Sequence, residues 1–132
     1  NMATYFRHWL NMRRLIPDPP RIFHVNWFRR DESGTFLWPG FGENMRVLLW
    51  IIDRCKGRLR AQETQLGWVP RREDFDLDGL PGMTPDRFEK LQAMNADEWR
   101  REILSHDELF MKLYTYLPKD MIFQRELLVA RL

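Results

Sequence analysis

The chain has 132 residues, of which 44% are hydrophobic and 30% charged, and its formal net charge is +2. This is the composition of one globular domain, and it excludes an intrinsically disordered chain. A single cysteine excludes an internal disulfide, and no apolar run approaches the roughly 20 residues that span a bilayer. We therefore expect a cytoplasmic protein without a membrane partner.

Helical and extended patterns alternate in the first third of the chain. Apolar residues at helical spacing predict a helix over residues 2–14, which the prolines from Pro17 onward end. Residues 21–28 alternate as in a strand, and both alternating faces are largely apolar. We therefore expect a strand buried within a larger sheet, with neighbouring strands contributed from outside the chain.

An apolar loop and a second helix follow. Residues 36–42 contain one proline and two glycines, which predicts a loop with unusual backbone angles. Residues 44–56 have helical spacing, and Gly57 is placed to cap their C-terminus. Cys55 falls in the apolar stripe of this helix and is expected to be a packing thiol. The whole stripe consists of Val47, Leu48, Ile51, Ile52 and Cys55.

The second half of the chain is dominated by helical signals. Residues 65–69 are a short strand candidate, and residues 74–82 are expected to form a polar loop. Thr84 and Pro85 have the residue types of a helix N-cap and first helical position. Further helices are expected over residues 99–113 and after Pro118.

The fold class that these elements predict is α+β, as part of a larger α/β enzyme domain. Short mixed strands come early, and helices predominate late, with residues 83–132 as a C-terminal helical segment. Two or three short strands do not make an independent sheet. We therefore expect the early part of the chain to need partners from outside it.

Motifs of catalysis or metal binding are not found in the sequence. It contains no Gly-x4-Gly-Lys-Ser/Thr loop for phosphates, no His-Glu-x-x-His and no Cys-x-x-Cys. Its histidines, His8, His24 and His106, are far apart, and His106 on an apolar face is more readily a packing residue than a catalyst. We predict no catalytic residue and no metal ligand in this chain.

A cluster of aromatic residues around a Gly/Pro loop remains, between Phe23 and Arg46. Aromatic faces can sandwich a flat ring, and glycines let backbone groups approach a ligand. Asn44 offers one acceptor and two donors, and guanine presents O6 as an acceptor with N1–H and N2–H as donors. A pocket of this kind matches guanine and mismatches adenine.

A purely structural interpretation of the same residues is also open. Asn44 has the residue type of a helix N-cap. Phe28, Phe36 and Phe41 are equally suited to a hydrophobic core. From these residue types alone, the structural interpretation is favoured over a guanine pocket.

The same stretch resembles the GTP-dependent phosphoenolpyruvate carboxykinases. The resemblance rests on Phe-His-Val-Asn-Trp-Phe-Arg-Arg at residues 23–30 and Phe-Leu-Trp-Pro-Gly-Phe-Gly-Glu-Asn at residues 36–44. It extends upstream to residues 8–10 and downstream through residues 66–70 and 77–80, and it fades over the last helices. The resemblance implies that residues 1–132 are the C-terminal part of the nucleotide-binding domain, with the guanine-pocket strand and loop at residues 21–46. Since Asn1 also fits the family, we expect a piece excised from a longer enzyme.

The resemblance also implies the residues of the site. Phe28 and Phe41 correspond to the aromatics that stack on guanine, and Phe36 to a third that closes the pocket. The segment that meets the base edge consists of Phe41, Gly42, Glu43 and Asn44. Trp27 and Pro39 are expected to support the pocket walls. Met45 stands where the family usually has a small serine, which could crowd the loop, but the contact positions are intact and we expect binding to be retained.

The implied parent reaction converts oxaloacetate and GTP to phosphoenolpyruvate, GDP and carbon dioxide, with manganese or magnesium. Its phosphate loop, metal ligands and substrate arginines lie outside this chain, so we expect the 132-residue chain alone to be inactive. The expected partners are guanine nucleotide and the rest of the parent enzyme, and no nucleic acid.

Three alternatives remain beside this interpretation. A non-catalytic module could bind guanine on its own, or a fragment could only fold and self-associate through an exposed strand edge. Single-stranded nucleic acid binding through the aromatics and nearby arginines is the third. These arginines are Arg29, Arg30, Arg46, Arg58, Arg60, Arg71 and Arg72.

Overall fold

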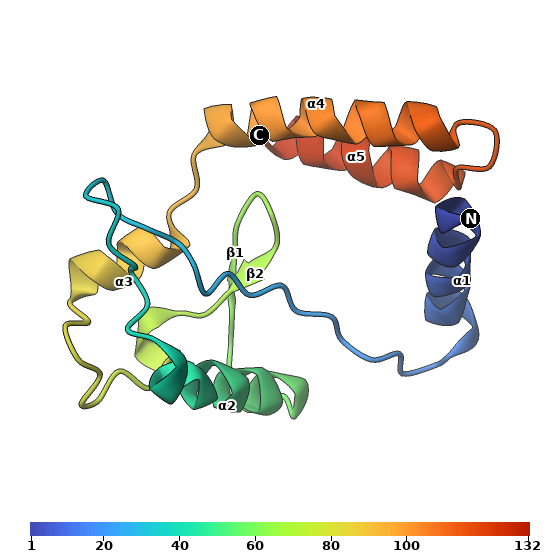
Figure 1. The fold of residues 1–132 in the computed structure, drawn as a ribbon. Coiled ribbons are helices and arrows are strands. Elements are labelled where there is room, and N and C mark those ends of the chain that lie inside the picture. Colours follow the sequence, from blue (N-terminus) through green and yellow to red (C-terminus); the bar gives the residue numbers. More distant parts are fainter. The chain divides into compact units, whose positions relative to one another are not determined.

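The computed structural model describes residues 1–132 and divides them into two compact units. One unit joins residues 1–20 to residues 95–132, and the other consists of residues 21–94 (Figure 1). Helices predominate, and the strands form one two-stranded antiparallel sheet. This is compatible with the predicted α+β class.

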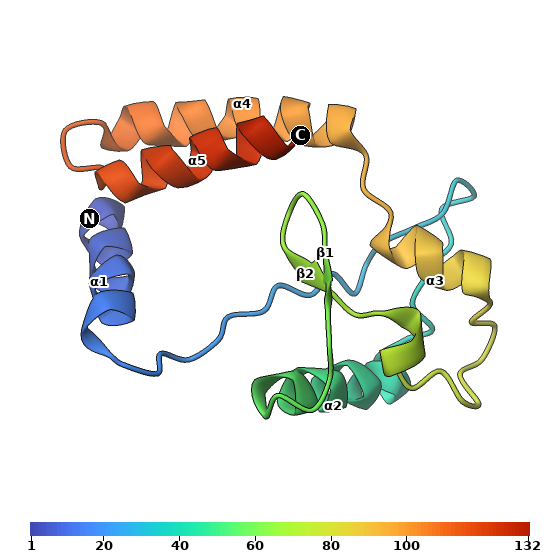
Figure 2. The same cartoon turned by 180° about the vertical axis from the view of Figure 1, so that it is seen from behind.

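The unit of residues 1–20 and 95–132 is a set of three helices. They are α1 (Met2–Leu15), α4 (Ala96–Leu113) and α5 (Lys119–Arg131). The side chain of Asn1 caps α1 by accepting from the N–H of Ala3 at 2.9 Å, and Asn95 caps α4 through the N–H groups of Asp97 and Glu98. Helices α4 and α5 lie side by side as a hairpin in both views (Figures 1 and 2). Helix α1 confirms the helix predicted over residues 2–14.

The unit of residues 21–94 contains two helices and a hairpin. Its elements are α2 (Asn44–Cys55), β1 (Gln62–Glu63), β2 (Trp68–Val69) and α3 (Pro85–Gln92). Short 3-10 turns at Phe41–Glu43 and Arg72–Asp74 precede α2 and follow β2. The strands pair in the register Gln62 with Val69 and Glu63 with Trp68. Only the last two residues of the strand expected over 65–69 are therefore paired.

The core of this second unit is aromatic. Trp38 meets Phe75 edge to face with ring centroids 6.2 Å apart, and Phe75 meets Phe88 at 5.6 Å. Trp50 from α2 and Leu80 are buried in the same cluster. Rings from segments far apart in the sequence thus hold the loop of residues 36–42, α2 and α3 together.

The predicted strand over residues 21–28 is wrong, although its alternation is real. Residues 21–26 belong to no strand, residues 27 and 28 form a turn, and the one bridge nearby joins Arg30 to Phe36. Phe23 and Trp27 pack against the core, whereas Ile22 and Phe28 are exposed. The alternation of apolar residues predicted correctly which side chains face the core. A strand also needs backbone hydrogen bonds to a neighbouring strand, and no such neighbour is present in this chain.

The buried stripe of α2 differs from the predicted one. Trp50 is 5% exposed and is flanked by Val47 and Ile51, which pack against the core. Leu48, Ile52 and Cys55 are exposed, so Cys55 is not a packing thiol. The burial of the large indole of Trp50 turns the helix by about one residue, or roughly 100°, from the expected orientation.

The helix termini follow the sequence signals closely. Gly57 has φ +71° after α2, and the N–H of Arg58 donates to the carbonyl of Asp53 at 2.9 Å, as in a Schellman motif. Thr84 caps α3 by accepting from the N–H of Arg87 at 3.2 Å. The predicted caps at Gly57 and Thr84 are confirmed.

The loop over residues 74–82 is less polar than expected. Phe75 and Leu80 within it are buried in the aromatic core. Elsewhere in the chain, none of the helices has both the length and the apolar character required to cross a membrane.

Candidate functional site

A tight turn brings Phe28 and Phe36 together. The N–H of Leu37 donates to the carbonyl of Arg29 at 2.8 Å, and the N–H of Asp31 donates to that of Thr35 at 2.9 Å. The two rings therefore lie on neighbouring backbone segments, with centroids 6.2 Å apart and planes inclined by 61°. The guanidinium carbon of Arg30 lies 3.8 Å from the centroid of the Phe36 ring.

Asp31 holds the tip of this turn. Its Oδ1 accepts from the hydroxyl of Ser33 at 2.6 Å and from the N–H groups of Ser33 and Thr35, both at 2.9 Å. The hydrogen bond from the Ser33 side chain, followed by that from the Thr35 backbone, lowers the pKa of Asp31 below its ordinary value. The turn is therefore organised by an ionised carboxylate.

Phe41 lies on a second turn, which Gly40 makes possible. Gly40 has φ +128°, a conformation that side chains of L-residues rarely adopt. Phe41 is 91% exposed, and its ring contacts neither Phe28 nor Phe36. The N–H groups of Phe41 and Gly42 donate to no carbonyl of the chain, since they begin the 3-10 turn.

Gly42 is not required by the chain's own packing. Its φ is not positive, and a Cβ added to it would meet no atom within 4 Å. A glycine without an internal reason is compatible with close approach of a ligand to the backbone.

The Glu43 carboxylate is engaged within the chain. Arg46 donates through Nε to Glu43 Oε2 at 2.7 Å, and its Nη1 lies 3.1 Å from Asp76 Oδ2. The hydrogen bond with Glu43 is the main cause that raises the pKa of Arg46 above its ordinary value. Glu43 therefore fixes the 3-10 turn to the first turn of α2, and only its backbone is left to face a base.

Asn44 is held by a tryptophan. The indole Nε1–H of Trp38 donates to Asn44 Oδ1 at 2.9 Å. The Asn44 side chain makes no capping hydrogen bond to the backbone, so the N-cap alternative is wrong. Its NH₂ group donates to no atom of the chain.

The structure thus assembles the six predicted residues in two groups. Phe28 and Phe36 meet on the first turn, and the other four, Phe41 to Asn44, follow one another on the second turn. The three rings do not form a closed slot. The core alternative is wrong for Phe28 and Phe41, which are 73% and 91% exposed.

Known proteins provide the deciding comparison. The profile of the family described as phosphoenolpyruvate carboxykinase C-terminal P-loop domain matches residues 1–131. The phosphoenolpyruvate carboxykinase (GTP) of Anaeromyxobacter sp. strain K is 47% identical over 129 residues, which is 98% of this chain. The Corynebacterium efficiens enzyme of the same name is 44% identical over all of it, and the mitochondrial one of Gallus gallus 42% over 99%.

The chain belongs to the GTP-dependent phosphoenolpyruvate carboxykinase family. It spans about a fifth of the length of these relatives, 22% in the Anaeromyxobacter carboxykinase and 20% in the chicken one. The phosphate-loop motif in the name of the carboxykinase domain is not present in these 132 residues.

Two side chains that sequence reasoning missed anchor the carboxykinase loop. Arg87 on α3 donates through Nε to the carbonyl of Leu37 at 2.8 Å and through Nη2 to that of Phe36 at 2.6 Å. Trp38 is the other. No local pattern marks Arg87, since its acceptors are about 50 residues away. Met45, the departure from the family pattern, is exposed and does not crowd the loop.

Side chains that could ligate a metal ion do not cluster in this chain. No group of three or more His, Cys, Asp or Glu side chains is placed to hold a metal ion.

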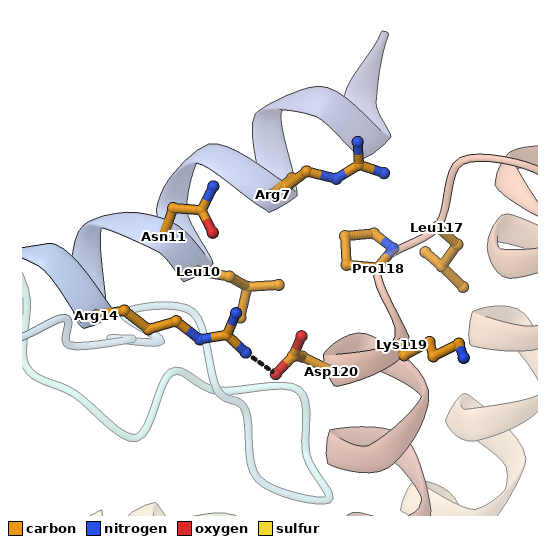
Figure 3. A pocket seen from close by; sticks show the side chains of 8 residues that line it. All are labelled: Arg7, Leu10, Asn11, Arg14, Leu117, Pro118, Lys119 and Asp120. Atoms are coloured by element: carbon orange, nitrogen blue, oxygen red, sulfur yellow. Dashed lines mark hydrogen bonds and ion pairs between the residues drawn. The ribbon is translucent and has the colours of Figure 1, made fainter.

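Two cavities lie away from the predicted carboxykinase site. One, of about 310 Å³, lies between one face of α1 and the start of α5, where Arg14 pairs with Asp120 at 2.7 Å (Figure 3). The other, of about 670 Å³, is lined by residues of the 72–83 segment, including Phe75 and Met83. None of the six predicted residues lines either cavity.

Proposed function

We propose that this chain is the guanine-recognition part of a GTP-dependent phosphoenolpyruvate carboxykinase. The parent enzyme converts oxaloacetate and GTP to phosphoenolpyruvate, GDP and carbon dioxide. Its phosphate-binding, metal-binding and oxaloacetate-binding groups lie outside these residues. The partners of the chain are guanine nucleotide and the remainder of the enzyme, which we place in the cytoplasm.

The exposure of Phe41 carries the proposal. A phenylalanine that is 91% exposed gains little from burial, and Phe41 follows a turn that Gly40 makes possible. Within residues 41–44, the N–H groups of Phe41 and Gly42 and the NH₂ group of Asn44 donate to no atom of the chain. An apolar face beside unused donors is the chemistry that a purine base matches.

Base recognition then has two components. The faces of Phe41 and Phe28 supply stacking, worth about 1–3 kcal/mol per base. Asn44 and the backbone of residues 41–43 supply hydrogen bonds to the base edge. Phosphoryl transfer itself depends on charge stabilisation by groups elsewhere, so the role assigned to this chain is binding and not catalysis.

Replacement of Phe41 with alanine tests the proposal. Phe41→Ala should weaken binding of GDP by about 5- to 100-fold, because one stacking face is lost. The thermal midpoint should stay within about 1 °C of the wild-type value, because an exposed side chain contributes little to stability. Calorimetric titration with GDP and a melting curve measure the two effects.

Phe123→Ala is the matched control, since Phe123 is an exposed phenylalanine of α5. It should leave GDP affinity unchanged. Equal affinity of the Phe41→Ala variant and the wild type for GDP would contradict the proposal, and so would turnover of oxaloacetate by the 132-residue chain alone.

The alternatives are less well supported. Family membership favours an enzyme part over a self-associating fragment. Five of the seven arginines named for nucleic acid binding interact within the chain, and the three that pair with carboxylates have part of their charge offset. Arg29 and Arg30 donate to carbonyls, while Arg46, Arg58 and Arg71 have carboxylate partners.

A further inference from the structure

An asparagine side chain does not by itself discriminate between guanine and adenine. A side-chain amide presents one acceptor and one NH₂ donor, and a 180° rotation exchanges them. One orientation fits guanine, whose O6 accepts and whose N1–H donates. The reverse orientation fits adenine, whose N6–H₂ donates and whose N1 accepts. An amide that is free to rotate therefore accommodates either base.

The Asn44 amide is not free to rotate. Trp38 Nε1 lies 2.9 Å from Asn44 Oδ1, and an indole nitrogen can only donate. The assignment of oxygen to this position therefore follows from chemistry. Rotation of the amide would place the NH₂ group against the indole N–H, so that two donors would face each other and a buried donor would lose its acceptor.

Trp38 is itself held firmly. It is 6% exposed, and its ring contacts Trp27 and Phe75 with centroid distances of 6.2 Å in both pairs. The indole therefore cannot follow a rotation of the amide. Helix α2 begins at Asn44, which fixes the backbone of the acceptor as well.

The outward group of Asn44 is the NH₂ donor. It makes no hydrogen bond within the chain, and its nitrogen is not among the buried unpartnered atoms, so solvent reaches it. The carbonyl oxygen keeps a second lone pair after accepting from Trp38. The fixed amide therefore offers a donor beside an acceptor in one order only.

We propose that Trp38 is the positioning residue that makes this site prefer guanine over adenine. It holds the Asn44 amide so that Nδ2 donates to O6 of the base while Oδ1 accepts from N1–H. Adenine presents N6–H₂ to the NH₂ group, where two donors oppose each other. This inference rests on the proposed function, because it requires that the base edge lies against Asn44.

The test uses Trp38→Phe, which keeps an aromatic ring in the core and removes the N–H group. The dissociation constants of GDP and ADP are measured for wild type and variant by calorimetric titration. The ratio of the ADP to the GDP constant should fall by about tenfold or more, through weaker GDP binding and stronger ADP binding. A merely structural role of Trp38 would weaken both nucleotides and leave the ratio unchanged.

Trp50→Phe is the control for the loss of a buried indole. Trp50 is 5% exposed in the same aromatic cluster, and its Nε1 has no hydrogen-bond partner. This variant loses similar volume but no acceptor is released. The ratio should remain that of the wild type, and an equal fall in both variants would overturn the proposal.

The remaining outcomes are also decisive. If Trp38→Phe does not fold, Trp38 is replaced by 3-benzothienylalanine, which has sulfur in place of the N–H group and the same bicyclic shape, and the same fall is expected. If the wild type binds GDP and ADP equally, this inference fails while nucleotide binding stands. If the wild type binds no guanine nucleotide, the proposed function fails and takes this inference with it.

Discussion

The two compact units of the chain differ in what holds them together. Residues 21–94 share an aromatic core of rings from separate segments, with Trp38, Trp50, Phe75 and Phe88 all buried. In residues 1–20 and 95–132, only Ala3, Ile103 and Pro118 are buried.

Surface ion pairs replace a core in that three-helix unit. Arg14 pairs with Asp120 and Arg125 with Asp107, both at 2.7 Å, and such pairs contribute only about 0–1 kcal/mol each. The candidate site residues therefore lie on the part of the chain whose geometry is fixed by its own core. The three helices keep much apolar surface exposed, including Leu104, Met111, Tyr114 and Phe123.

Removal of an aromatic ring from the core should have the largest effect on stability. Phe88→Ala should lower the free energy of unfolding by about 3–5 kcal/mol, because the ring is 4% exposed and leaves a cavity. Phe123→Ala in the three-helix unit should change it by less than about 0.5 kcal/mol. Urea denaturation followed by tryptophan fluorescence measures both, and similar losses in the two variants would refute the contrast between the units.

A smaller effect should distinguish the two glycines of the candidate site loop, Gly40 and Gly42. Gly40→Ala should cost about 1–3 kcal/mol of stability, because φ +128° is strained for alanine. Gly42→Ala should leave stability within about 0.5 kcal/mol, because the added Cβ meets nothing in the chain, yet it should weaken GDP binding. Thermal melts and GDP titration distinguish the two roles, and unchanged GDP affinity in Gly42→Ala would remove that glycine from the site.

The smallest expected effect is local and depends on pH. The pKa of Asp31 is lowered in the folded chain from its ordinary value of 3.8, so its stabilisation of the turn is complete above that pH and is lost as the pH falls through the lowered value. Amide NMR signals of Ser33 and Thr35 should therefore shift together in strong acid. Asp31→Asn keeps an acceptor without titrating, and the same shift in this variant would exclude Asp31 as its cause.

The sequence predicted local structure better than long-range contacts. The caps at Thr84 and Gly57 depend on residues within one turn of the helix terminus, so they were found correctly. The strand over residues 21–28 failed because pairing needs a distant partner. The stripe of α2 failed because the burial of Trp50 is decided by rings from other segments.

The candidate site shows the same division between local features, which the sequence indicates, and long-range contacts, which it does not. The residues Phe28, Phe36 and Phe41 to Asn44 were named from motif resemblance, and their role stays a prediction. No spacing in the sequence could indicate that Trp38 donates a hydrogen bond to Asn44. Nor could it indicate that Arg87, about 50 residues away, donates to the carbonyl of Leu37. Tertiary hydrogen bonds of this kind leave no periodic signature in the sequence.

The exposure of Cys55 provides a means of observing the site. It is the only thiol of the chain, it faces solvent, and it ends the helix that begins at Asn44. Eleven residues of helix separate the two positions by about 17 Å along the axis. A single maleimide dye or nitroxide can therefore be attached without any mutation, at a fixed distance from the Asn44 amide, to test in real time whether nucleotide arrives at the candidate site.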